Sequence, residues 1–60
     1  MPKYIAIYED KNAEIVSTAY FNADNISKAK ASAQMHKRRT PEIVKAKGVK
    51  TMVRRMKDED

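Results

Sequence analysis

Lys3-Tyr4-Ile5-Ala6-Ile7-Tyr8-Glu9 is the stretch of sequence that decides the fold. It is rich in β-branched and aromatic side chains and is followed by turn-forming residues, a pattern that predicts a β-strand. Because side chains alternate between the faces of a strand, Ile5 and Ile7 share one face while the two tyrosines and Ala6 share the other. We expect one face to form the core and the tyrosine face to be only half covered.

The next residues predict a β-hairpin. Asp10-Lys11-Asn12-Ala13 places Asp and Asn where a type I turn tolerates them. A second strand is predicted from Glu14 to Phe21, where β-branched and aromatic residues recur. Strict alternation gives this strand two sets of side chains, with Val16, Thr18 and Tyr20 on one face and Ile15, Ser17, Ala19 and Phe21 on the other.

A helix is predicted from Ile26 to about Arg39. Asn25 is a favourable N-cap residue, and the basic residues of the last turn suit the negative end of the helix dipole. At helical spacing, one narrow stripe of side chains should lie on the sheet, formed by Ile26, Ala29, Ala33 and His36. Thr40-Pro41 should end the helix, since the residue before a proline avoids helical geometry.

The last twenty residues have two interpretations. As strands, they comprise Glu42 to Lys47 and Gly48 to Met56, with Gly48 as a bulge or turn. As helices, Pro41 lies in the first turn, Gly48 ends that helix, and Val49, Met52, Val53 and Met56 repeat at helical spacing. We favour an α+β fold of the ββαβ type, a three-stranded antiparallel sheet covered by one helix, because a lone hairpin is marginally stable. The alternative is ββαα.

The length and charge of the chain suggest one binding domain. Its 60 residues with no cysteine predict a single small domain over 1–57, with an acidic tail at 58–60 that frays. Residues 1–27 hold two basic and four acidic side chains, whereas residues 28–57 hold eleven basic and one acidic. We therefore expect an electrostatic surface for nucleic acid or an acidic partner. Its predicted residues are Lys37, Arg38, Arg39, Lys45, Lys47, Lys50, Arg54 and Arg55.

Other classes of function find little support in the sequence. With His36 as the only histidine and no cysteine, no metal site or metal cofactor is expected. Gly48 alone does not form a phosphate-binding loop, and no catalytic constellation is evident, so we expect neither catalytic residues nor a cofactor or small-molecule substrate. The apolar stretches are too short to cross a membrane and no signal peptide opens the chain, which predicts a cytoplasmic protein without a membrane partner.

The segment Phe21-Asn22-Ala23-Asp24-Asn25-Ile26-Ser27-Lys28-Ala29, continuing to Ala33, combines a strand end, a polar cap and alanines at helical spacing. Preceded by a hairpin, it resembles small ββαβ proteins that bacteriophages encode to take over host machines. The resemblance covers about residues 3–39 and implies a non-enzymatic binder of a large host protein or nucleoprotein complex in the bacterial cytoplasm. This chain is basic rather than acidic, which favours an acidic partner or nucleic acid over mimicry of DNA.

Three hypotheses of function follow. The first is a phage or mobile-element accessory protein that binds nucleic acid, or a nucleic-acid machine, through its basic helix and C-terminal half. The second is an inhibitor or adaptor of a host protein that uses a sheet edge or the tyrosine face. The third is a small structural homodimer. Tyr4, Tyr8 and Tyr20 would stack on bases if they shared an open sheet face, although packing in the core or hairpin is favoured.

Overall fold

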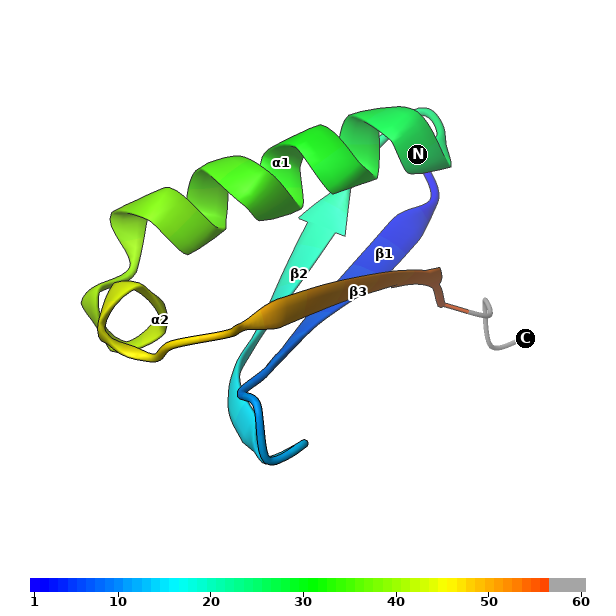
Figure 1. The fold of residues 1–60 in the computed structure, drawn as a ribbon. Coiled ribbons are helices and arrows are strands. Elements are labelled where there is room, and N and C mark those ends of the chain that lie inside the picture. Colours follow the sequence, from blue (N-terminus) through cyan, green and yellow to red (C-terminus); the bar gives the residue numbers. More distant parts are fainter. Residues whose placement is uncertain (57–60) are drawn as a thin grey trace.

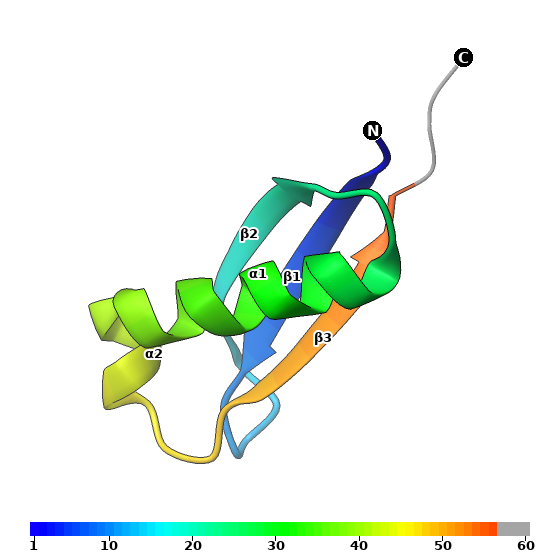
Figure 2. The ribbon, with the colours of Figure 1, turned by 90° about the horizontal axis from the view of Figure 1, so that it is seen from above.

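A three-stranded antiparallel sheet forms one layer of the protein, and two helices form the other (Figures 1 and 2). The computed structural model describes residues 1–56. The central strand β1 (Lys3–Glu9) pairs with β2 (Ile15–Asn22) on one side and with β3 (Lys50–Arg55) on the other. The predicted α+β class and the third strand are confirmed, whereas the tail predicted at 58–60 lies outside the described residues.

The helix α1 (Ile26–Arg39) begins and ends where the sequence predicts. Asn25 caps it, since its side-chain oxygen accepts a hydrogen bond from the backbone N–H of Lys28 at 3.0 Å. Ala29 and Ala33 are fully buried against the sheet, and their small side chains let the helix axis approach it closely. Ile26, predicted on the same stripe, is 40% exposed, so the buried part of the stripe starts one turn later.

The core lies on the tyrosine face of β1. Tyr4, Ala6 and Tyr8 are buried there beneath α1, and Ile5 and Ile7 point to the opposite face. The expectation that the tyrosine face is only half covered is therefore wrong. The tyrosine face is covered because its side chains complement α1. The long tyrosine rings fill the space beside a helix whose contact positions are alanines, and the Tyr8 hydroxyl donates a hydrogen bond to a carbonyl of that helix.

A bulge at the start of β2 changes the predicted alternation. Tyr8 pairs with Ser17 and Glu9 pairs with Ile15, so Val16 is an extra residue on the β2 side. Val16 consequently packs against the core, and Ile15 is 63% exposed. The predicted faces of this strand are wrong at Ile15 and Val16.

The segment between α1 and β3 resolves the ambiguity of the C-terminal residues. Pro41–Lys45 forms a short helix, α2, so the strand interpretation of Glu42 to Lys47 is wrong. Proline suits this position because its fixed φ matches the first turn and its missing N–H has no partner to lose. The helical interpretation of the residues after Gly48 is wrong in turn, since they form β3.

The loop that enters β3 depends on glycine. Gly48 has φ of 69°, and a Cβ added there would lie 3.3 Å from the Cβ of Lys11 in the β1–β2 turn. Both the positive φ and this close approach favour a residue without a side chain. The loop can therefore pass next to the hairpin turn before β3 pairs with β1.

Neither helix of residues 1–56 is long and apolar enough to cross a membrane.

Candidate functional site

The structure brings five of the eight predicted binding residues to one end of the molecule. They come from the last turn of α1, the last residue of α2 and the loop that follows it (Figures 1 and 2). We call this set the basic end, and it comprises Lys37, Arg38, Arg39, Lys45 and Lys47. Arg38, Arg39, Lys45 and Lys47 are exposed.

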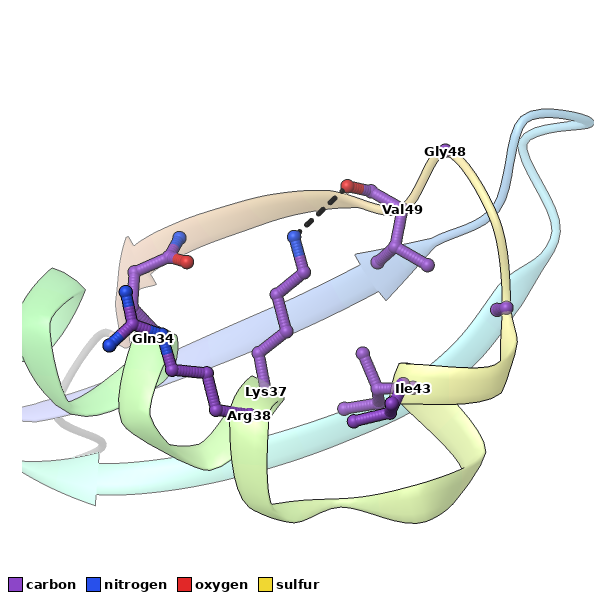
Figure 3. A pocket seen from close by; sticks show the side chains of 8 residues that line it. Gln34, Lys37, Arg38, Ile43, Gly48 and Val49 are labelled. Atoms are coloured by element: carbon purple, nitrogen blue, oxygen red, sulfur yellow. Dashed lines mark hydrogen bonds between the residues drawn. The ribbon is translucent and has the colours of Figure 1, made fainter.

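The concentration of positive charge in the last turn of α1 has a structural cause. The last turn of α1 carries His36 and three cations, and positive charge there offsets the unpaired carbonyl groups of the helix C-terminus. Lys37 is partly buried, and its ammonium group donates a 3.3 Å hydrogen bond to the carbonyl oxygen of Val49 (Figure 3). Lys37 therefore ties α1 to the loop before β3, which leaves the other four cations better placed to contact a ligand.

A shallow hollow of about 460 Å³ separates α1 from α2 and the following loop. Figure 3 shows the Lys37 side chain extending across this hollow. Arg38 and Gln34 of α1 lie on one side of it, and Ile43 of α2 and Val49 of the loop lie on the other. Among residues 1–56, no acidic side chain lines this hollow. It therefore presents cationic donors beside an apolar floor, a combination that suits an anionic group more than a cation.

His36 is occupied by structural contacts. Its ring packs against Phe21 in an edge-to-face arrangement with centroids 5.9 Å apart, and its centroid lies 5.8 Å from that of Tyr8. Nε2 lies 3.2 Å from the hydroxyl of Thr40, which also donates a 2.8 Å hydrogen bond to the His36 carbonyl. The ring thus joins the helix end to the sheet, beside a second hollow of about 320 Å³ that Arg39 also lines.

The other three predicted residues belong to β3 and do not share one face. Cross-strand pairing places Lys50 opposite Glu9, Arg54 opposite Ile5 and Arg55 opposite Tyr4. Arg55 therefore points to the helix side of the sheet, and Lys50 and Arg54 point to the side without helices. The predicted residues do not form one continuous surface, because consecutive residues of a strand face opposite ways.

Sequence reasoning considered a sheet face shared by the three tyrosines, but it did not identify the side of the sheet that the helices leave uncovered. We call it the open sheet face. It holds Lys3, Ile5, Ile7 and Glu9 of β1, Ile15, Thr18, Tyr20 and Asn22 of β2, and Lys50, Met52 and Arg54 of β3. Tyr20 is 59% exposed there, whereas Tyr4 and Tyr8 are in the core. Because Ile5 pairs with Tyr20, the two side chains lie on the same side of the sheet. The sequence does not show that this side is uncovered, since that depends on which face of β1 the helices cover.

Metal-ligating side chains and the buried Tyr8 hydroxyl are the remaining groups of chemical interest among the described residues. Among residues 1–56, no group of three metal-ligating side chains gathers in one place. Burial raises the pKa of Tyr8, because a phenolate is poorly solvated in the core, but this hydroxyl is enclosed and bonded to a helix carbonyl. The surfaces that the structure presents to a partner are the cations of the basic end and the open sheet face.

No protein-family model matches this chain, and no curated protein or solved structure matches it significantly.

Proposed function

We propose that this protein binds nucleic acid without catalysing a reaction, with the basic end contacting phosphates. The observation that carries the proposal is the convergence of the basic end from α1, α2 and the following loop. Cations that contact phosphates release counterions from the nucleic acid, and this electrostatic term supplies affinity irrespective of base sequence. Arginine side chains add planar, bidentate donors that match the phosphate group.

The cations of the basic end make no salt bridge within residues 1–56, and this supports the same proposal. Within residues 1–56 the one salt bridge joins Lys28 to Asp24 at 3.0 Å, at the opposite end of α1 from the basic end. Within the described structure, therefore, none of the cations of the basic end forms a salt bridge, and Glu42 of α2 is the acidic residue nearest to them in the sequence. A set of like charges held at one end raises the local concentration of an anionic polymer and speeds its association.

The test is the salt dependence of affinity, measured by fluorescence anisotropy with labelled DNA from about 50 to about 200 mM salt. The variant is Arg38→Glu with Arg39→Glu, and the matched control is Lys28→Glu with Lys30→Glu, which removes the same charge from the other end of α1. We expect a linear log–log plot for the unaltered protein. The arginine variant should bind more weakly and flatten the slope by about one to two.

Two outcomes would overturn the proposal. Undetectable binding by the unaltered protein at low salt would remove nucleic acid as the partner. An equal loss in the arginine variant and the lysine control would show that net charge, and not the basic end, supplies the affinity. A phage or mobile-element origin and a bacterial cytoplasmic location remain predictions of the resemblance.

A second candidate function is binding of a host protein through a sheet edge. With the order β2-β1-β3, the outer edges of β2 and β3 pair with no other strand of residues 1–56. Such edges accept an extended segment of another chain by main-chain hydrogen bonds. A stoichiometric protein recovered on the immobilised chain from nuclease-treated bacterial lysate would favour this function over the first.

A further inference from the structure

The open sheet face combines an aromatic side chain, aliphatic side chains and cations in register. One row across the three strands consists of Tyr20, Ile5 and Arg54, and the next consists of Thr18, Ile7 and Met52. Tyr20 is 59% exposed and Met52 is 37% exposed. In the described structure both helices lie on the opposite side of the sheet, so nothing covers these rows (Figures 1 and 2).

The charge of this face argues against a second copy of the chain as its occupant. The face holds three cationic side chains, Lys3, Lys50 and Arg54, and one acidic side chain, Glu9. Two copies stacked through it would bring two surfaces of the same sign together, and like charges facing each other across an interface are unfavourable.

The chemistry of the face suits single-stranded nucleic acid better than a duplex. The open sheet face presents no helix that could enter a groove, whereas the exposed ring of Tyr20 offers a plane on which an unpaired base stacks. Exposed aromatic residues on sheets serve this purpose in common RNA-binding modules. Arg54 and Lys50, on the far side of Ile5 and Glu9, supply donors for the phosphates of the same strand.

The chain also runs directly from the basic end into this face. Lys47 lies in the loop that leads directly into β3, and Lys50 is the first residue of that strand. A nucleic-acid backbone that contacts the basic end can therefore continue along β3 to Arg54. We propose that the open sheet face binds single-stranded nucleic acid, with a base stacked on Tyr20 and phosphates at Lys50 and Arg54. This inference rests on the proposed function, since it names the form of nucleic acid bound.

The experiment compares Tyr20→Leu with Tyr20→Phe, using fluorescein-labelled oligothymidylate as the single strand and the same strand annealed to oligoadenylate as the duplex. Leucine preserves an apolar side chain without a ring, and phenylalanine preserves the ring. Tyr20→Leu should weaken single-strand binding about fivefold or more and duplex binding less than about twofold. Tyr20→Phe should bind both probes as the unaltered protein does. Arg54→Gln should weaken single-strand binding and reduce its salt slope by about one.

The outcomes separate this inference from the proposed function. If the leucine variant binds the single strand as tightly as the phenylalanine variant, the open sheet face is not the site, while salt-dependent binding at the basic end stands. If the unaltered protein binds neither probe at low salt, both are overturned. Sedimentation of the unaltered protein as a dimer that Tyr20→Leu dissociates would assign the face to a second copy and overturn the inference.

Discussion

The hydroxyl of Tyr8 donates a 2.7 Å hydrogen bond to the main-chain carbonyl of Ala33, which joins the central strand to the middle of α1. Both residues are fully buried, so this polar contact lies inside the core. Because an unpaired hydroxyl in the core is costly, the bond offsets the cost of burying the Tyr8 side chain on the covered face of β1. Ile5 and Ile7, on the other side of the same strand, belong to the open sheet face.

Removing this hydroxyl should weaken the fold without creating a cavity. Tyr8→Phe should lower the free energy of unfolding by about 1 kcal/mol, since one buried hydrogen bond is lost and the ring still fills its site. Urea unfolding followed by circular dichroism measures the change. Tyr20→Phe is the control because its hydroxyl lies on the open sheet face, and it should leave the free energy of unfolding unchanged. Equal effects of the two variants would contradict this role for Tyr8.

The same residue should make stability depend on alkaline pH. Burial raises the pKa of Tyr8 above its usual value near 10. Its contribution is therefore fully present below about pH 10 and is lost as pH rises toward the folded-state pKa, because the unfolded chain releases the proton first. The difference in unfolding free energy between the unaltered protein and Tyr8→Phe should shrink above about pH 10. A difference that stays constant through that range would contradict the prediction.

The short helix α2 should contribute to the core through one residue. Ile43 is 1% exposed and packs with Tyr8 and Ala33, whereas its neighbour Val44 is 62% exposed. Ile43→Val should lower the free energy of unfolding by about 1 kcal/mol, because it removes one buried methylene group. Val44→Ala should change it by less than about 0.5 kcal/mol. Chemical denaturation of both variants tests whether α2 is docked as described, and a larger effect at Val44 would contradict it.

The hydroxyl of Thr51 is buried without a hydrogen-bond partner among the described residues. Thr51→Val keeps the shape of the side chain and removes the unsatisfied oxygen, so it should raise the free energy of unfolding by about 1 kcal/mol. Thr18→Val, on the open sheet face, is the matched control and should change it by less than about 0.5 kcal/mol. A destabilising effect of Thr51→Val in thermal or urea unfolding would show that the hydroxyl has a partner in solution.

The elements that depend on local signals are those the sequence predicts best. Asn25 marks the start of α1 by side-chain capping and Pro41 marks the start of α2 by its fixed φ, and α1 extends over the predicted residues. The prediction for the covered face of β1 is wrong because both faces are apolar, and the α1 residues that cover one of them are distant in the sequence. Propensity alone did not separate strand from helix after Pro41, since β-branched residues occur in both α2 and β3.

The part of the candidate site that depends on local sequence could be predicted, and the part that depends on strand pairing could not. The basic residues of the last turn of α1 were recognisable from charge alone, and the structure gathers them with Lys45 and Lys47. The opposite directions of Arg54 and Arg55 follow from the pairing register of β1 with β3. That register, like the bulge at Val16, is set by contacts between residues far apart in the sequence.

The five isoleucines provide the most direct test of where nucleic acid binds. Ile5, Ile7 and Ile15 belong to the open sheet face, whereas Ile43 is in the core and Ile26 lies in the first turn of α1. Methyl NMR spectra of the unaltered protein should be recorded during titration with oligothymidylate at low salt. We predict that the methyl signals of Ile5 and Ile7 shift most, and that the signal of Ile26, at the opposite end of α1 from the basic end, stays nearly fixed. Shifts confined to Ile26 and Ile43, or no shift at all, would contradict binding at the open sheet face.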